Sequence, residues 1–331
     1  MSVITSKILV TGAGGFVGGQ LVRELVSRGA AVRAMVRHPD KAGFLKDLGV
    51  ELVQANMKET ASLARAVEGV GGVCHIAALF REAGLPDSEY HKVNVEGTQS
   101  LLEAAIAAGV RRFIHCSTVG VLGHIENPPA DENTPYNPGD VYQRSKMEGE
   151  KIALDYFRSG RISGVVIRPA MIWGPGDTRT LKMFRMIARG RFFYVGRGRA
   201  SVHFIDVRDL ARAFVLALEH DERHGEIYII AGRQALPLRS LAEAIASRLA
   251  VRPPRLCLPV KPMQWLGSAC EALCTPLGIS PPLYRRRVDF YTKSRSFNGT
   301  KAERDLGFRP AQGLVEEVGD IIEDYKERGW L

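Results

Sequence analysis

The most constraining feature of this sequence is a glycine-rich turn between a short apolar run and a helix-length segment near the N-terminus. Gly12, Gly15 and Gly18 have the spacing G-x-x-G-x-x-G. The first glycine allows a tight turn, the second lets the backbone approach a pyrophosphate, and the third lets helix and strand pack closely. Because the turn follows an expected strand at Ile8–Val10 and precedes an expected helix at Gly19–Arg28, the sequence predicts nucleotide binding rather than a bare turn.

The following residues alternate short β-branched runs with helix-length segments. The expected strands lie at Ile8–Val10, Val32–Val36, Val50–Gln54, Val73–Ala77, Arg112–Ser117, Gly164–Ile167 and Glu226–Ile230. The expected helices lie at Gly19–Arg28, Ser62–Glu68, Val95–Ala108, Tyr142–Arg158, Asp209–Glu219 and Leu314–Arg328. Apolar strands that do not alternate with polar residues, joined through helices, predict an α/β fold with a Rossmann-type doubly wound parallel sheet.

This alternation loosens after about residue 170. We therefore expect a dinucleotide-binding domain at residues 1–170, to which residues 203–231 return. Residues 171–202 and 232–331 are expected to form a smaller C-terminal lobe that binds the substrate.

Composition and charge narrow the class of protein. Of the 331 residues, 45% are hydrophobic and 24% are charged, as is usual for a globular protein. No stretch has the about 20 apolar residues of a membrane-spanning helix, and the first residues lack secretory-signal features, so we expect a cytoplasmic location. Five cysteines, without metal-site spacing, argue against a disulfide framework and against a metal site. The net charge of +9 favours anionic ligands, but no nucleic-acid-binding motif accompanies it.

The end of the second expected strand distinguishes NAD from NADP. A carboxylate at this position binds the ribose hydroxyls of NAD. Here the strand Val32–Val36 is followed by Arg37 and His38, with Lys41 nearby. A guanidinium suits the 2′-phosphate of NADP, so the sequence predicts NADP as the preferred cofactor and NAD as the alternative.

Tyr142 and Lys146 form a candidate catalytic pair. Residues four apart lie on one helix face, so both side chains can point into the same space. A free tyrosine has a pKa of about 10, and a nearby ammonium lowers that pKa by stabilising the phenolate. The pair can then act as general acid and base. Ser117 and Thr118, at the end of an upstream strand, place a hydroxyl where it could hydrogen-bond a substrate oxygen.

These features resemble the extended short-chain dehydrogenases/reductases, which belong to the NAD-dependent epimerase/dehydratase family. The resemblance covers nearly the whole chain and is greatest to members of the 3β-hydroxysteroid dehydrogenase and dihydroflavonol reductase types. Beyond the glycine turn and the Tyr-x-x-x-Lys pair, the motifs that carry it are His75–Ala78, Asn94–Thr98, Arg168–Pro169, Trp173–Asp177, Phe204–Ala211, Ser296–Asn298, Lys301–Ala302 and Asp305–Pro310.

The resemblance implies a role for each matching residue. Tyr142 is the acid/base, and Lys146 lowers its pKa and holds the nicotinamide ribose. Thr118 is the catalytic hydroxyl, with Ser117 as the near alternative. The implied cofactor contacts are Gly12, Gly15, Phe16, Val17, Gly18, Arg37, Asn56, Met57, Ala77, Ala78, Tyr142, Lys146, Pro169 and Ile172. Asn56 departs from the usual Asp beside the adenine, although an amide can still hydrogen-bond the exocyclic amine.

Several reactions use this scaffold. The 4,6-dehydratases place Asp-Glu after the catalytic Thr, whereas Thr118 is followed by Val119 and Gly120. Nucleotide-sugar epimerases usually carry an Asn-containing segment where this chain has residues 170–172, and an acidic end of the second strand. The resemblance therefore implies an oxidoreductase that transfers a hydride between nicotinamide and a ketone or secondary alcohol, with a sterol-like or other apolar substrate favoured. A nucleotide-sugar epimerase and a non-catalytic NAD(P)-binding sensor are the alternatives.

The C-terminal lobe suggests further partners. An apolar stripe could cover an apolar substrate, touch a membrane surface with Arg285–Arg287 at the headgroups, or pack within the lobe. The stripe consists of Met263, Leu266, Cys270, Leu273, Cys274 and Leu277, with Trp265 beside it. Residues 196–199 could face a substrate phosphate or form a solvated loop. Family members often dimerise through two helices, here Val95–Ala108 and Tyr142–Arg158, so we expect a homodimer that acts on a small molecule and binds no nucleic acid.

Overall fold

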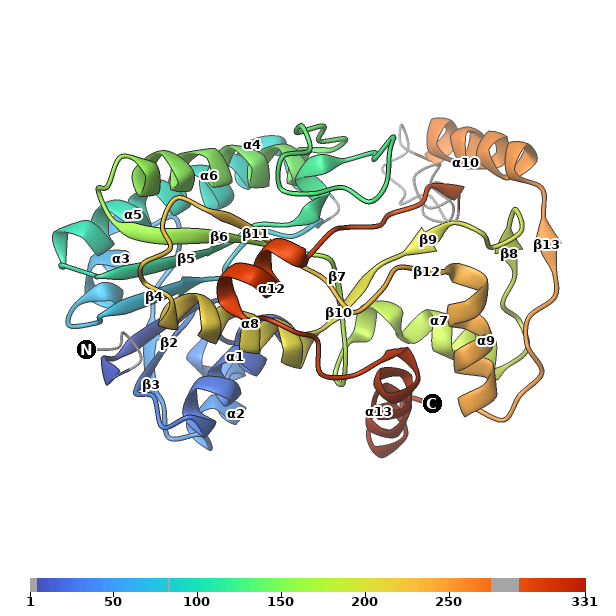
Figure 1. Ribbon diagram of the computed structural model, residues 1–331, viewed down its shortest axis with the longest axis horizontal. Coiled ribbons are helices and arrows are strands. Elements are labelled where there is room, and N and C mark those ends of the chain that lie inside the picture. The colour runs from blue at the N-terminus through green and yellow to red at the C-terminus, as the bar shows by residue number, and fades with distance from the viewer. Residues whose placement is uncertain (1–4, 83, 275–291) are drawn as a thin grey trace.

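The centre of the structure, a computed structural model that describes residues 5–82, 84–274 and 292–331, is a parallel sheet of seven strands (Figure 1). The strands are β1 (Ile8–Thr11), β2 (Val32–Val36), β3 (Glu51–Gln54), β4 (Gly72–His75), β5 (Arg112–Cys116), β6 (Ser163–Pro169) and β11 (Ile227–Ile230). Their order is β11-β6-β5-β4-β1-β2-β3, and each neighbouring pair is parallel. The predicted doubly wound α/β sheet is therefore confirmed.

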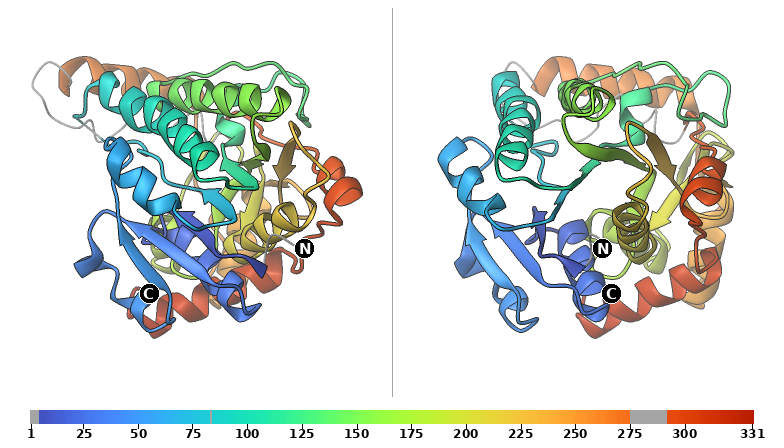
Figure 2. Two further views of the ribbon diagram at one scale, coloured as in Figure 1. Left: turned by 90° about the vertical axis from the view of Figure 1, so that its left-hand side faces the viewer. Right: turned by 60° about the vertical axis from the view of Figure 1, so that its left-hand side comes forward.

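Helices cover both faces of this sheet (Figure 2). On one face lie α1 (Phe16–Ser27) and α8 (Val207–Glu219). On the other lie α3 (Thr60–Val67), α5 (Gly97–Ala107) and α6 (Val141–Arg158). Successive side chains of a strand point to opposite faces, so Ile8 and Val10 join the first core while Leu9 joins the second. Because both faces are covered, β1 and β4 are buried at every residue and show no polar alternation.

The strand order reverses between β1 and β4. From β1 the chain builds outward to β2 and β3, and then returns to β4 on the other side. The carboxyl ends of strands at such a reversal frame a ligand crevice. The glycine turn follows β1 and Ile76–Ala78 follow β4, so both border this crevice. Short helical elements complete this part: η2 (Pro39–Lys41), α2 (Gly43–Lys46), α4 (Asp87–His91), η3 (Lys92–Glu96) and η4 (Val119–Leu122).

Two predicted helix starts were wrong. Helix α1 begins at Phe16 rather than Gly19, although glycine has a low helix propensity. Gly18 is needed inside this helix despite its low propensity, because a Cβ there would lie 2.2 Å from the Gly12 carbonyl oxygen. The expected helix from Val95 is also divided, since η3 is a π-helical turn and the regular α5 begins at Gly97.

The second part of the chain builds a smaller set of elements around its own core. The helices α7 (Thr178–Ala188), α9 (Leu238–Arg248) and α13 (Leu314–Glu327) supply this core, and α10 (Val260–Cys274) lies in the same part of the chain. Helix α12 (Thr300–Leu306) instead packs on β11 and α8 of the main sheet. The strand pairs of this second part are β7 (Met171–Trp173) with β10 (Phe204–Asp206), β9 (Ser201–Val202) with β12 (Leu236–Pro237), and β8 (Tyr194–Val195) with β13 (Cys257–Leu258). Between β10 and β12 the chain returns to the main sheet, where α8 packs on α1 and β11 extends the sheet beside β6. The division into domains at the predicted boundaries stays a prediction.

Helix α7 was missed in the sequence. Asp177 caps it by accepting a hydrogen bond from the Arg179 N–H at 3.0 Å. Leu181, Phe184 and Ile187 then bury one face of the helix. An acidic N-cap followed by apolar residues three apart was the signal that could have predicted this helix. The helical apolar stripe is present as α10 up to Cys274; the stripe's last member and the three consecutive arginines lie outside the described residues.

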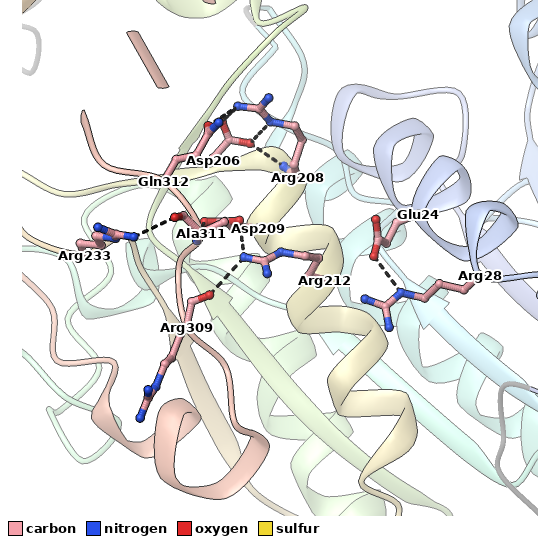
Figure 3. Close-up of polar contacts among 10 residues, drawn as sticks. All are labelled: Glu24, Arg28, Asp206, Arg208, Asp209, Arg212, Arg233, Arg309, Ala311 and Gln312. Carbon is pink, nitrogen blue, oxygen red and sulfur yellow. Dashed lines mark hydrogen bonds and ion pairs between the residues drawn. The ribbon is translucent and has the colours of Figure 1, made fainter. Parts of the chain in front are cut away.

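The segment before α13 is fastened to α8 by polar contacts (Figure 3). Asp209 accepts a hydrogen bond from the Ala311 N–H at 2.9 Å. The Arg208 guanidinium donates to both Asp206 and Gln312 at 2.8 Å. The two acidic residues of the late D-x-x-D-L-A motif therefore hold the C-terminal segment in place, which is a structural role.

Stability will depend on pH through Glu317 of α13, which accepts a hydrogen bond from Trp173 Nε1 at 2.9 Å. Burial, reinforced by the negative charge of Asp206, raises the pKa of Glu317 from 4.5 to about 8. The folded state therefore keeps a proton that the unfolded state loses, so the free energy of unfolding falls as pH rises through this window. We expect a fall of about 1–3 kcal/mol from pH 6 to pH 8, most of which Glu317→Gln will abolish. Urea unfolding at both pH values measures it.

The matched control for this prediction is Glu316→Gln, because Glu316 is the exposed neighbour on the same helix. That variant should keep the fall in stability seen in the wild type. Superimposable pH profiles for the wild type and Glu317→Gln would contradict the assignment.

Candidate active site

The glycine turn ends β1 and leads directly into α1. Gly12 has a φ of 68°, and a Cβ there would lie 3.0 Å from the Ala77 backbone, so only glycine fits without strain. Thr11 Oγ1 accepts hydrogen bonds from the N–H groups of Ile76 and Ala77, both at 3.0 Å. These bonds fasten the end of β4 beside the turn. Gly15 caps α1 without a side-chain hydrogen bond, which leaves the positive end of the helix dipole for a ligand.

A cavity of about 1570 Å³ extends from this turn to the start of α6. It is lined by every residue predicted to contact the cofactor, namely Gly12, Gly15, Phe16, Val17, Gly18, Arg37, Asn56, Met57, Ala77, Ala78, Tyr142, Lys146, Pro169 and Ile172. Ser117 and Thr118 line the same cavity. The uncapped helix end and the close glycine backbone fit a dinucleotide pyrophosphate, so the structure brings the predicted residues together around a space that suits the cofactor.

The packing of Gly18 leads to a prediction about cofactor binding. A Cβ at Gly18 meets the Gly12 carbonyl oxygen at 2.2 Å, whereas at Gly14 the nearest atom is a Val36 methyl at 3.7 Å. Overpacking of this kind costs about 1–3 kcal/mol. We expect this cost to appear in cofactor binding, so Gly18→Ala will raise the Kd for the dinucleotide roughly 10- to 100-fold. Gly14→Ala is the matched control and should bind normally. Fluorescence titration with NADPH measures both, and equal affinities would contradict the packing argument.

The far end of the cavity has a basic character. Arg37, His38 and Lys41 line it after β2. Asn56 lines it after β3, and its amide oxygen accepts a hydrogen bond from the Lys58 N–H at 3.2 Å. A carbonyl oxygen has two lone pairs, so the Asn56 side chain is held in one orientation and can still accept a second hydrogen bond.

Tyr142 and Lys146 lie in the first turns of α6, which Asp140 caps by accepting from the Gln143 N–H at 2.7 Å. Lys146 is almost fully buried, and its Nζ donates to the Cys116 carbonyl oxygen at 2.6 Å, at the end of β5. Both side chains line the cavity. Among the described residues, the two make no hydrogen bond with each other, so the ammonium is held by the strand end rather than by the phenol.

The protonation of this pair differs from the sequence expectation. Burial raises the pKa of the Tyr142 phenol above its usual value, and the nearby Cys116 thiol adds to this effect. Burial also lowers the pKa of Lys146. The pKa of the phenol is therefore raised rather than lowered as the sequence predicts, and the charges that oppose the rise are those of Arg81 and Arg179. Tyr142 therefore carries its proton at neutral pH, as an ordinary tyrosine also does, and can act as a proton donor.

Hydrogen bonding distinguishes the two candidate hydroxyls. The Ser117 hydroxyl donates to the carboxylate of Glu150, deep beneath the cavity. Thr118 Oγ1 accepts from the Gly120 N–H at 3.0 Å, which leaves its own hydrogen available to a substrate oxygen. The geometry therefore favours Thr118 over Ser117 as the hydroxyl that contacts the substrate.

Two residues beside Tyr142 were missed in the sequence. The Phe80 ring packs edge-on against the Tyr142 ring at 5.0 Å, and the Arg81 guanidinium lies 4.9 Å from the centre of the same ring. Arg81 also donates to Asp140 at 3.0 Å. The positive charge of Arg81 opposes the rise in the Tyr142 pKa. No sequence pattern links the loop after β4 to α6, so this contact could not be predicted.

Away from the glycine turn, the cavity has a large apolar lining, and the charged residues Arg179, Lys182 and Arg295 line it as well. Its apolar lining comes from Met171, Met183, Met186, Phe192, Phe193, Phe204, Met263 and Phe297. His203 is structural, since its ring nitrogens hydrogen-bond Gly232 O and Phe297 N. Residues 196–199 are not among those that line the cavity, which favours a solvated loop over the alternative of contact with a substrate phosphate. The Met and Phe residues of this lining come from separate elements and form no sequence motif, so the sequence did not predict them as a group.

Comparison with known families decides the identity of the fold. A model described as the NAD dependent epimerase/dehydratase family matches residues 8–231. The chain belongs to this family. The predicted resemblance is confirmed, and so is the expectation of an enzyme of the extended short-chain dehydrogenase/reductase type.

Relatives of this epimerase/dehydratase chain include oxidoreductases. A 3 beta-hydroxysteroid dehydrogenase/Delta 5-->4-isomerase of Mycobacterium tuberculosis is 30% identical over 96% of this chain and 90% of its own length. A 2-alkyl-3-oxoalkanoate reductase of Stenotrophomonas maltophilia is 32% identical over 94% of this chain and 96% of its own. The crystal structure of gox2253 superposes with a TM-score of 0.83 at 31% identity, over 98% of this chain and 99% of that one. Within the described residues of this family member, no helix is both long and apolar enough to cross a bilayer.

Proposed function

We propose that this enzyme is an NADP-preferring oxidoreductase that interconverts a ketone and a secondary alcohol on a large apolar substrate. The observation that carries the proposal is the part of the cavity that Met and Phe side chains line, which we call the chamber. Tyr142 lines the same cavity. Thioether and aromatic side chains suit apolar molecules of irregular shape. The names of the relatives, a steroid dehydrogenase and an alkyl-oxoalkanoate reductase, support the same class of substrate.

The dinucleotide and three polar side chains of the cavity each have a task in this reaction. The bound dinucleotide supplies or accepts the hydride. Tyr142 donates its proton to the carbonyl oxygen during reduction. Thr118 hydrogen-bonds the same oxygen. Lys146, held by the Cys116 carbonyl, supplies the positive charge that stabilises the resulting phenolate.

A panel of ketones tests the proposal. The protein is incubated with NADPH and either a steroid 3-ketone, a 2-alkyl-3-oxo acid or a UDP-hexose, and NADPH absorbance and products are followed. We expect stoichiometric NADPH oxidation with at least one apolar ketone. Interconversion of the sugar nucleotide without net NADPH consumption would identify an epimerase instead. Tight NADPH binding with no turnover of any compound would identify a sensor.

The cofactor preference depends on Arg37. No carboxylate lines the cavity at the end of β2, within the part of the chain that the structure describes, and Arg37 is available there for a 2′-phosphate. A charged hydrogen bond contributes about 1.5–3 kcal/mol, so Arg37→Ala will lower the ratio of kcat/KM for NADPH to that for NADH roughly 10- to 100-fold. Arg65→Ala removes the same charge from an exposed site on α3 and should leave the ratio unchanged. An unchanged ratio in Arg37→Ala would reject this role.

The remaining partner expectations are also proposals. Helices α5 and α6 pack beside each other on one face of the sheet, where the family analogy puts a homodimer contact. Light scattering of the purified protein measures the oligomeric state. The cytoplasmic location stays a prediction from the sequence.

A further inference from the structure

Exposed apolar side chains are concentrated around helix α10. Seven large apolar side chains are exposed among the described residues, and four of them lie in the short stretch that contains α10. These are Leu256, Trp265, Leu266 and Leu273, with exposed fractions of 60%, 78%, 48% and 71%. A tryptophan with this exposure is unusual on a surface that faces only water.

The exposed residues of α10 share one face of the helix. At 100° per residue, Lys261, Pro262, Trp265, Leu266, Ala272 and Leu273 all fall within one side, and all are exposed. Gly267 is buried, and Met263 points to the cavity that holds the candidate active site. The outer face of α10, which we define by these six exposed residues, is therefore apolar apart from one lysine.

Charges around this face are mostly positive. Exposed Arg252 and Arg255 precede the helix, Lys261 lies in its first turn, and Glu271 is the acidic residue of residues 252–274. The whole chain carries a net charge of +9. An apolar helix face with a tryptophan and a cationic border fits the headgroup region of an anionic bilayer. A symmetric contact between two copies would place like charges on both sides of the interface, which disfavours that occupant.

The mouth of the cavity lies on the same edge of the molecule. Phe80 and Leu85, two of the other exposed apolar residues, line the cavity together with Met263 of α10. Figures 1 and 2 place α10 and α4, which follows Leu85, along the same edge. Exposed apolar residues therefore border the cavity on the edge of the molecule that also carries α10.

We propose that the outer face of α10 docks this protein on anionic membranes with the cavity mouth toward the lipid. Docking rests on the exposed face and its charges alone. A second consequence rests also on the proposed function: in this orientation an apolar ketone can pass between the lipid and the chamber without crossing water.

Vesicle sedimentation tests the docking. The full-length protein is mixed with vesicles of equimolar phosphatidylcholine and phosphatidylglycerol, or of phosphatidylcholine alone. We expect sedimentation with the anionic vesicles, weakened by salt, and a blue shift of tryptophan emission. Trp265→Gln/Leu273→Gln will weaken binding roughly tenfold or more, because two apolar anchors are lost. Val315→Gln, which removes an exposed apolar side chain from α13, should bind like the wild type.

The outcomes separate docking from the proposed function. Both changed positions are exposed, so urea unfolding should show a normal fold for the double variant, and its turnover of a water-soluble ketone should be unchanged. Equal sedimentation of wild type and double variant would overturn the docking. So would vesicle-independent dimers that the double variant abolishes, because a second copy would then cover the face. Vesicle binding without turnover of any ketone would leave docking intact and reject only the proposed reaction.

Discussion

Tyr142→Phe will lower kcat roughly 10²- to 10⁴-fold while leaving the Kd for NADPH within a few-fold of the wild type. The phenol is the proton donor, whereas its ring packs against Phe80 and beneath Arg81. Phenylalanine preserves that packing and removes only the hydroxyl. Steady-state turnover of the ketone identified by the panel, together with a fluorescence titration of NADPH, separates catalysis from binding.

A second tyrosine provides the control for this experiment. Tyr228 is fully buried in β11, away from the cavity, and its hydroxyl has no hydrogen-bond partner within the described structure. Tyr228→Phe makes the same chemical change in the core and should retain normal turnover. If Tyr142→Phe kept a kcat within threefold of the wild type, the acid/base role would be lost, and Thr118 would be the next residue to test.

Glu150→Gln will lower the free energy of unfolding by about 3–5 kcal/mol. Glu150 and Arg168 form an ion pair at 2.5 Å, with side-chain exposures of 0% and 1%. Ser117 and Tyr136 also donate hydrogen bonds to this carboxylate, the latter at 2.7 Å. Neutralising Glu150 leaves the buried Arg168 charge without its carboxylate partner, which is far less favourable than losing a surface pair. Urea denaturation measures the change.

Two further variants test whether the buried charge is the cause. Glu150→Gln/Arg168→Met removes both charges and should recover much of the lost stability, because an apolar replacement of a buried ion pair is often neutral. Glu103→Gln breaks an exposed pair with Arg161, at 3.0 Å, and should change stability far less. A double variant less stable than Glu150→Gln would show that packing around Arg168, rather than its charge, dominates.

The residues expected to contact the cofactor could be predicted from the sequence, because their placement depends mostly on short-range geometry. The turn through Gly12, Gly15 and Gly18 lies between adjacent elements, and the close approach of Gly18 to Gly12 is local, although Gly12 also packs against Ala77. The four-residue spacing of Tyr142 and Lys146 puts both side chains into one cavity on a single helix. Arg37 follows directly on a strand end. For Tyr142, Lys146 and Arg37, the period of the helix or strand is enough to place the side chain.

What the sequence by itself determined was the order of the central strands and of most helices that flank them, the family, and the residues predicted to border the dinucleotide. Only the tertiary structure decided that Ser117 is engaged by Glu150, that Arg81 lies over Tyr142, and which apolar residues line the chamber. Burial likewise decided that the pKa of Tyr142 is raised rather than lowered. These features depend on which distant segments pack together, and packing partners and desolvation follow from the whole fold rather than from a local period.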